Sequence, residues 1–392
     1  MTIQHKTQRR EFIQTAMAGC VLLSVPLSTT FASASNTKPS NNQPSNNGNK
    51  KVVWIMLRGA MDSLHAVIPS FDKNYFAYRT SSINSIKDEL LPLDDGYALH
   101  PAFKHLHQLY RKKQFSAVVA VATSYRERSH FDAQDHMESG LDEIDHENGW
   151  LARAIQQYQG QSLAISRTIP IALRSNKGDT ANTWYPSSFK PADEDLLDRL
   201  AGLYEKDDEL SGLLQKAVEQ RDNPNMMSEG KKRPKFTLLA NRCGEILSND
   251  PNIKCAMLEL GGWDTHNNQA GRLQRQFSLL DDGIKSLQEG LGKAWDDTLV
   301  LVTTEFGRTV ALNGTSGTDH GTASCLFMLG GNIRQGGEVL GKWPGLAVDD
   351  LFEKRDLMPT SDVRTWISKG LQRHWGLSKQ QSNAIFPDLE LR

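Results

Sequence analysis

The sequence has little cysteine, no excess of either charge and no visible internal repeat. Its 392 residues include 45 lysines or arginines and 46 aspartates or glutamates, so the formal net charge is −1. Proteins that bind nucleic acid usually carry a basic excess, and the absence of one here predicts no nucleic-acid partner. The apolar share of 38% is ordinary for a globular protein and is enough to build a large core.

Cysteine is scarce enough to limit disulfide chemistry. Only Cys243, Cys255 and Cys325 follow residue 34, so at most one internal disulfide can form and one thiol is left over. Cys243 and Cys255 are the better pair for such a bond. Three buried, reduced cysteines that act as small hydrophobic side chains are an equally good interpretation.

Residues 1–34 have the organisation of an export signal. Arg9 and Arg10 precede a modest apolar region, residues 16–27, and a small-x-small cleavage site follows at residues 32–34. This arrangement resembles a twin-arginine signal peptide. An amphipathic N-terminal helix or a membrane anchor is the alternative, but the apolar region is too short to span a bilayer and contains Pro26. We therefore expect the twin-arginine translocase as a partner during export, and a periplasmic or secreted mature protein.

The remaining chain divides into a linker and one folded domain. Residues 35–50 are almost entirely polar and cannot bury enough surface to offset the entropy of ordering, which predicts a disordered tether. Residues 51–392 are expected to form a single α/β domain. Within it, residues 190–235 combine helical leucine spacing with a polar, breaker-rich end, which predicts a helical insertion over the sheet.

Several short apolar runs without alternation predict strands that are buried on both faces of a sheet. An amphipathic helix is expected over Gln269–Leu291, between two of these runs. The order strand, loop, helix, strand predicts a doubly wound, mainly parallel sheet with helices on both faces. The predicted strands are Val52–Leu57, Ser116–Thr123, Thr168–Leu173, Lys254–Leu260 and Leu299–Thr303.

Carboxylate and imidazole side chains follow three of these strands and occupy one later loop. Parallel sheets bind their ligands at the carboxyl ends of the strands, and this mixture of donors suits a divalent metal, zinc or manganese, as one or two ions. Each residue also has a structural explanation as a turn, cap or hydrogen-bonding residue. The candidate metal ligands are Asp62, Asp264, His266, Glu305, Asp319 and His320.

The segment 126–136 looks like a loop that enters a helix at Ser129. In one interpretation Ser129 caps the helix, with Asp132 at the third helical position. In the other, the helix start directs Ser129, His130 and Asp132 into a pocket, while Arg126 and Arg128 contact an anion. The two interpretations are compatible, and the residues alone favour neither.

Six motifs in order make the chain resemble the DUF1501 family of exported bacterial proteins, from about Lys51 to the C-terminus. That family is grouped with the alkaline phosphatase and sulfatase superfamily, which implies an alkaline phosphatase-like doubly wound sheet with two metal ions at the strand ends. The motifs are Arg58-Gly59-x-x-Asp62, Tyr125-Arg126-x-Arg128-Ser129-His130-Phe131-Asp132-Ala133-Gln134, Trp263-Asp264-Thr265-His266, Thr304-Glu305-Phe306-Gly307-Arg308, Gly317-Thr318-Asp319-His320-Gly321 and Trp343-Pro344-Gly345-Leu346.

The resemblance also implies roles for matched positions. Asp62 would bind one metal, Asp264 with His266 the other, and His320 would be the late histidine ligand. Glu305 lies where the superfamily has an aspartate–histidine pair at a strand end. Phe306 replaces the expected histidine, so the resemblance supports the fold more strongly than the activity.

The expected function is that of an exported, metal-dependent hydrolase-like protein acting on phosphate or sulfate esters. The expected catalytic residues are Ser129, as the nucleophile, and Arg308. A small anionic ester would be bound by Arg58, Arg126, Arg128 and His130. The alternative is a catalytically degenerate family member that binds a ligand, or assembles an unknown protein partner, at the cell envelope.

Replacing both Arg9 and Arg10 with lysine tests the export signal. We expect the precursor to stay in the cytoplasm, because the twin-arginine pathway reads the arginine pair itself rather than its charge. The measurement is an immunoblot of cytoplasmic and periplasmic fractions. Lys6→Arg, a matched exchange outside the pair, should export normally, and an undiminished periplasmic yield of the double variant would exclude the twin-arginine route.

Overall fold

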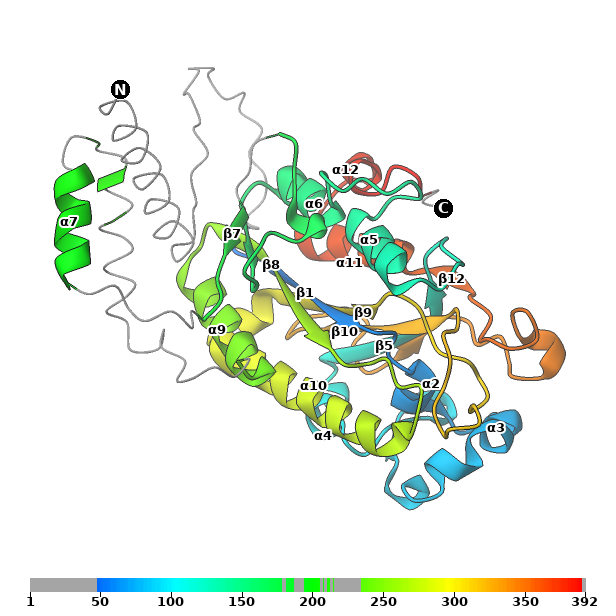
Figure 1. The fold of residues 1–392 in the computed structure, drawn as a ribbon. Helices are drawn as coiled ribbons and strands as arrows, with labels where there is room; N and C mark the ends of the chain where they lie inside the picture. The colour runs from blue at the N-terminus through cyan, green and yellow to red at the C-terminus, as the bar shows by residue number, and fades with distance from the viewer. Residues whose placement is uncertain are drawn as a thin grey trace, which may run out of the picture.

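The structure, a computed structural model, describes residues 48–177, 181–186, 194–204 and 234–389, together with positions 207, 210, 211 and 214. A large twisted sheet lies at the centre, with helices packed above and below it (Figure 1). The predicted signal peptide, most of the predicted linker and much of the predicted insertion lie outside the described residues. Among those that are described, no helix is long and apolar enough to cross a bilayer.

The main sheet is mostly parallel. β1 lies between β8 and β9 and is parallel to both, β8 continues in parallel to β6 and β7, and β10 runs antiparallel between β9 and β5. In spatial order the strands are β11 (Val339–Leu340), β5 (Phe115–Ala122), β10 (Ser324–Leu329), β9 (Thr298–Thr304), β1 (Lys51–Arg58), β8 (Ile253–Gly261), β6 (Gln161–Ala164) and β7 (Ala181–Thr183), with β12 (Ser361–Asp362) paired to β5.

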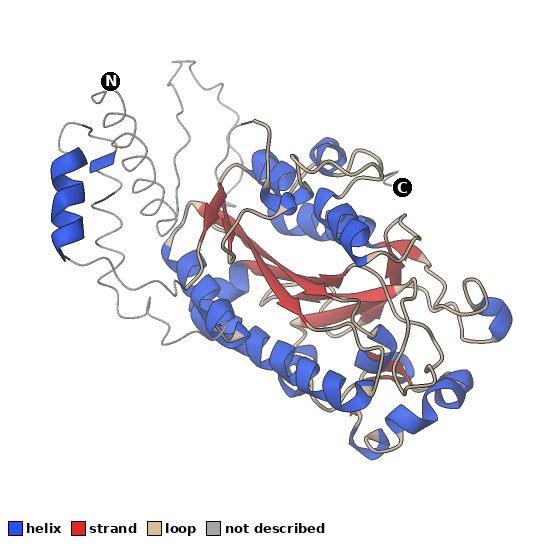
Figure 2. Ribbon diagram, viewed as in Figure 1, coloured by secondary structure: helices blue, strands red, loops and turns tan. Residues whose placement is uncertain are grey.

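Alternate residues of β1 point into two separate cores. Val53, Ile55 and Leu57 pack against one set of helices, whereas Val52, Trp54 and Met56 pack against the other. Because both faces are covered, the central strands are apolar throughout, as the sequence pattern predicts. Figure 2 shows the helices on either side of the strands. On the first face lie α4 (Lys104–Arg111), α9 (Phe236–Asn249) and α10 (Gln269–Leu291), and on the second α5 (His130–Ser139), α6 (Trp150–Tyr158), α11 (Val363–Trp375) and α12 (Lys379–Ile385).

These features confirm the predicted doubly wound, mainly parallel α/β fold. The expected strand at Thr168–Leu173 is wrong: the chain forms a short 3-10 helix at Ile171–Leu173. Pro170 precedes it and has no N–H to donate to a neighbouring strand. The remaining described α-helices and strands are α2 (Ser63–Ala66), α3 (Lys73–Ile83), α7 (Glu194–Tyr204) within the predicted insertion, and a small antiparallel sheet of β2 (Val67–Pro69), β4 (Tyr97–Leu99) and β3 (Leu91–Pro92).

The three cysteines after residue 34 are buried, free thiols. Burial raises the pKa of each thiol well above its ordinary value, so all three stay protonated. They act as small hydrophobic side chains, the second of the two alternatives left open by the sequence.

A fully buried ion pair joins the end of β1 to α3. Arg79 Nη1 donates to Asp62 Oδ2 over 2.6 Å, and the side chains of both residues are at most 1% exposed. Arg79 also donates to the backbone carbonyls of Thr309 and Val310, and Gln269 Nε2 donates to Asp62. Burial alone would raise the pKa of Asp62, but the charge and hydrogen bonds of Arg79 hold it below its ordinary value. The pair fixes the first strand end against two later loops.

Arg79→Met tests this pair. The substitution leaves the Asp62 carboxylate buried without its counter-charge, so we expect the free energy of unfolding to fall by about 3–5 kcal/mol. The measurement is urea unfolding followed by circular dichroism. Arg111→Met, at the exposed end of α4, is the control and should change stability by no more than about 0.5 kcal/mol. Equal stabilities of the two variants would contradict this account.

Candidate metal centre

Three histidines converge on one carboxylate oxygen at the carboxyl ends of the central strands. The Nε2 atoms of His266, His320 and His130 lie 2.9, 3.4 and 3.6 Å from Asp264 Oδ1. The Nε2 atoms of His266 and His320 are 3.1 Å apart. His130, Asp264 and His320 each offer a ligand atom within 4.8 Å of the others, which is a group able to hold a metal ion.

The other nitrogen of each ring contacts an oxygen acceptor. His130 Nδ1 lies 2.8 Å from Glu305 Oε1, His320 Nδ1 lies 3.0 Å from the carbonyl oxygen of Arg128, and His266 Nδ1 lies 3.1 Å from Asp319 Oδ1. Acceptors at these positions favour the tautomer that carries its proton on Nδ1. That tautomer directs the lone pair of each Nε2 towards the shared space, as metal-binding histidines require.

The donor set fits a divalent metal. Zinc bonds to nitrogen and carboxylate oxygen are about 2.0–2.2 Å long, so the ligand atoms of a tetrahedral site lie roughly 3.3 Å apart. Within the group of His130, Asp264 and His320, the separations from Asp264 Oδ1 to His320 Nε2 and His130 Nε2, 3.4 and 3.6 Å, are close to that value. In addition, His130 Nε2 is buried without a hydrogen-bond partner. A buried polar atom of this kind needs a partner, and a metal ion would supply one.

Glu305 positions His130 from the end of β9. Its Oε1 accepts from the backbone N–H of Gly59, from His130 Nδ1 and from Gln134 Nε2 at 2.7–2.9 Å, and Thr304 Oγ1 donates to Oε2. The carboxylate is buried, and three of these donors share its Oε1, while the single proton of Thr304 Oγ1 is shared between Oε2 and the carbonyl of Leu57. Burial would raise the pKa of Glu305, but the hydrogen bonds from His130 and Gln134 hold it below its ordinary value.

Arg308 keeps Asp264 ionised. Its Nη1 donates to Asp264 Oδ1 at 2.8 Å, while its other donors contact Thr318 Oγ1 and the Thr318 carbonyl. Although partial burial opposes it, the hydrogen bond and charge of Arg308 lower the pKa of Asp264. A carboxylate that stays ionised is the form that binds a metal.

The half-buried imidazoles of His130 and His320 lie in different electrostatic surroundings. The hydrogen bond to Glu305 raises the pKa of His130, whereas burial lowers the pKa of His320. Phe306 packs on both rings, with centroid distances of 4.9 Å to His130 and 5.2 Å to His320. The phenylalanine in place of the expected histidine therefore forms an apolar wall that holds two of the converging rings.

Glycines allow the loops of the site to approach one another. Gly59 has a φ of +115°, and a Cβ there would lie 2.7 Å from the backbone nitrogen of Asp264. At Gly317 a Cβ would lie 2.1 Å from the backbone carbon of His266. Any larger residue at either position would push apart the segments that carry the converging side chains.

The other expected metal ligands contact protein groups. Asp62 is paired with Arg79, as described above, and Glu305 accepts from Gly59, His130 and Gln134. Asp319 accepts from His266 and from Asn313 Nδ2. These three carboxylates orient neighbouring groups. His130, which the sequence analysis expected to contact substrate, lies instead among the converging rings.

Ser129 stands at the N-cap position of α5 with extended backbone angles, but its side chain makes no cap hydrogen bond. The position predicted from the sequence is therefore correct, whereas the capping interaction is not formed. The backbone N–H of Ser129 donates instead to the Tyr125 hydroxyl over 3.3 Å. Ser129 directly precedes His130, so it lies next to the converging rings in the chain.

Most of the arginines expected to bind an anion already have acidic partners. Arg58 contacts Glu138 and Glu259, each over 2.6 Å, and Arg128 contacts Glu353 and Asp356. Arg126 donates to the carbonyls of Thr123 and Tyr125 and, within the described part of the chain, has no ion pair. It is therefore the expected anion-binding arginine whose charge is least compensated.

The sequence analysis missed residues that hold other site residues in place by hydrogen bonds. Gln134 stands in a recognised motif, but only the structure shows that it bridges Arg58 and Glu305. Gln269 lies at the start of α10 and contacts Asp62 and Thr318. Neither has a spacing signal, because amides in helices are usually solvated. The one clue to their roles is that both lie in helices, next to loops that follow strands.

Solved structures with a similar fold share little sequence with this chain. Ps i-CgsB, solved in complex with k-i-k-neocarrahexaose, matches at a TM-score of 0.41 with 10% identity, over 85% of this chain and 74% of that one. The alkaline phosphatase from the Antarctic bacterium TAB5 matches at 0.39 with 10% identity, over 87% and 99%. The C-terminal periplasmic domain of EcEptC from Escherichia coli, in complex with zinc, matches at 0.36 with 10% identity, over 73% and 74%.

The family assignment comes from the sequence itself. No curated protein matches the chain. Residues 112–386, more than half of the chain, match the family model described as "Protein of unknown function (DUF1501)". This segment contains five of the six motifs and all the histidines of the site. The protein therefore belongs to the DUF1501 family.

Proposed function

We propose that this protein is an exported, metal-dependent hydrolase of phosphate or sulfate esters. The observation that supports the proposal is the convergence of three imidazole Nε2 atoms on Asp264 Oδ1, with each Nδ1 held by an oxygen acceptor. A site built only for stability has no need to orient three lone pairs towards one point. Metal hydrolases use this kind of nitrogen and oxygen donor set.

His130, Asp264 and His320 would hold the ion, with His266 beside them at the more exposed edge. A divalent ion bound there would supply a Lewis acid that polarises an ester oxygen and acidifies water. The carboxylate of Glu305 keeps the proton of His130 on Nδ1, and the Arg128 carbonyl does the same for His320. The proposed centre has fewer ligands than the six carboxylates and histidines expected from the sequence. An outer group of residues orients those ligands.

The substrate would be a small anionic ester. Arg126, without a carboxylate partner among the described residues, is the candidate contact for its outer oxygens. Ser129 remains the candidate nucleophile because its side chain does not cap α5 and it adjoins His130. Proton transfer to the leaving group would fall to His266 in its protonated form, because its side chain is 42% exposed and can take up a proton from solvent.

A catalytically degenerate binding or assembly protein is the second candidate. Arg58, Arg128 and Arg308 are each engaged by acidic side chains, which leaves few cations to stabilise a transferring phosphoryl or sulfuryl group. A protein that retains the metal centre only to bind a ligand or a partner at the envelope would tolerate this loss.

Metal content tests the centre directly. Purified protein should contain about one equivalent of zinc, manganese or another divalent ion, and His130→Ala or His320→Ala should remove it. Glu305→Gln should weaken metal binding by about 10- to 100-fold, because it disturbs the residue that orients His130. Elemental analysis and competition with a chelator measure both effects.

Two controls separate this set from the one expected from the sequence. His107→Ala removes an imidazole outside the site and should leave the metal content unchanged. Asp62→Asn should lower the melting temperature but retain the metal, because Asp62 is paired with Arg79. Loss of metal in Asp62→Asn would overturn the proposed centre. So would wild-type protein that contains no metal and whose stability a chelator does not change.

Hydrolysis is tested with aryl phosphates and aryl sulfates on metal-loaded protein. We expect turnover of one ester class by the wild type, and a loss of at least about 100-fold in kcat for Ser129→Ala at an unchanged melting temperature. The unchanged melting temperature follows from the missing cap hydrogen bond. Kinetic assays and thermal unfolding are measured on the same preparations.

Ser124→Ala, in the preceding loop, is the matched hydroxyl control and should keep full activity. Full activity of Ser129→Ala would exclude the nucleophile while leaving a water-based hydrolase possible. If metal-loaded wild type turns over neither ester class, the binding or assembly function replaces the hydrolase.

A further inference from the structure

A cavity of about 510 Å³ lies at the opposite end of the sheet from the metal centre. Asp297, which lines it, precedes β9, whereas Glu305 follows that strand. Strands rise about 3.3 Å per residue, so roughly 25 Å separate the cavity from the site that Glu305 orients. Cavities of this volume commonly enclose small organic ligands. It is therefore a separate candidate site.

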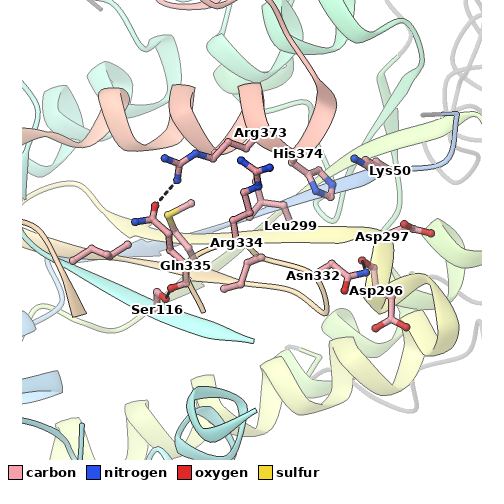
Figure 3. Close-up of a pocket in the computed structure, with 14 residues that line it drawn as sticks. Lys50, Ser116, Asp296, Asp297, Leu299, Asn332, Arg334, Gln335, Arg373 and His374 are labelled. Atoms are coloured by element: carbon pink, nitrogen blue, oxygen red, sulfur yellow. Dashed lines mark hydrogen bonds between the residues drawn. The ribbon is translucent and has the colours of Figure 1, made fainter. Parts of the chain in front are cut away.

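The charged groups of the cavity are unevenly distributed. Lys50, Arg334 and Arg373 face two carboxylates, Asp296 and Asp297, so the lining carries a net charge of +1. In Figure 3 the two arginines lie towards one end and the two aspartates towards the other. The arginine end is therefore positive and suits an anion.

The arginines are not neutralised by the protein. Across residues 234–389 and the other described segments, neither Arg334 nor Arg373 forms an ion pair. Arg373 donates to the neutral amide oxygen of Gln335 (Figure 3). Guanidinium groups without an acidic partner retain their capacity to form charge-assisted hydrogen bonds with a ligand.

Between the charged groups the wall is apolar. Leu299 of β9, Met328 of β10 and Leu340 of β11 line it, and Gly370 of α11 lets the helix approach the strands. His374 also lines the cavity, but burial lowers its pKa to about 4, so it is neutral near pH 7. Its Nε2 donates to the carbonyl of Lys51 over 2.8 Å. The cavity thus combines a positive end with an aliphatic wall.

We propose that this cavity binds a small amphipathic organic anion. The carboxylate or phosphate group of the ligand lies between Arg334 and Arg373, and its apolar body contacts the aliphatic wall. The site is independent of the proposed hydrolase activity, because no residue of the cavity belongs to the metal centre.

Phenylphosphonate is a suitable probe, since its carbon–phosphorus bond resists ester hydrolysis and it combines a dianion with a ring. Titration calorimetry should detect binding at millimolar or lower concentration both in the wild type and in His320→Ala, which lacks the metal centre that would also accept this aryl phosphate analogue. Arg334→Gln and Arg373→Gln should each weaken it by about tenfold, which corresponds to about 1.4 kcal/mol. Inorganic phosphate, which has no apolar body, should bind more weakly than phenylphosphonate.

Two variants keep this test separate from the metal centre. Lys369→Gln removes a positive charge from the same helix outside the cavity and should leave binding unchanged. His320→Ala should also retain binding, even if it abolishes metal content. Equal weakening by Lys369→Gln, loss of binding in His320→Ala, equal affinity for inorganic phosphate, or no binding at millimolar concentration would each overturn the proposal.

Discussion

The site depends on a single buried carboxylate, that of Glu305. A buried charge is costly unless donors surround it, and here the donors come from the loop after β1, from β9 and from two residues of α5. The same contacts that stabilise Glu305 therefore hold His130 in place. Loss of the carboxylate would release both the first strand end and the helix that carries the histidine.

The sequence pattern predicts the core of the fold because a strand that is buried on both faces is a continuous run of apolar residues. The apolar runs that become β1, β8 and β9, and the helix α10 with its bounds, follow from the spacing of hydrophobic residues alone. Thr168–Leu173 has a similar apolar content but lies outside the sheet, where Pro170 and a 3-10 turn prevail. Composition cannot distinguish a short buried loop from a short buried strand.

Sequence pattern also finds the loops of the site but not the role of each residue. Asp62, Asp264 and Glu305 all follow strands, yet one pairs with Arg79, one faces three imidazoles and one orients His130. The difference lies in partners far along the chain. Arg79 stands in a helix with no strong apolar face, so nothing local marks it as the buried counter-charge of Asp62. The spacing of residues along the sequence shows which of them follow a strand. Whether such a residue can bind a metal depends on its tertiary contacts.

The distance along the chain between these partners has a thermodynamic consequence. Gly59 and Glu305 are 246 residues apart, and the converging histidines come from two other loops and one helix, so an unfolded chain cannot present the centre. The proposed ion would therefore bind the native state alone. At a thousandfold excess over its dissociation constant it would add about 4 kcal/mol to the free energy of unfolding. The lifetime of the folded protein would then depend on the concentration of the divalent ion in its surroundings.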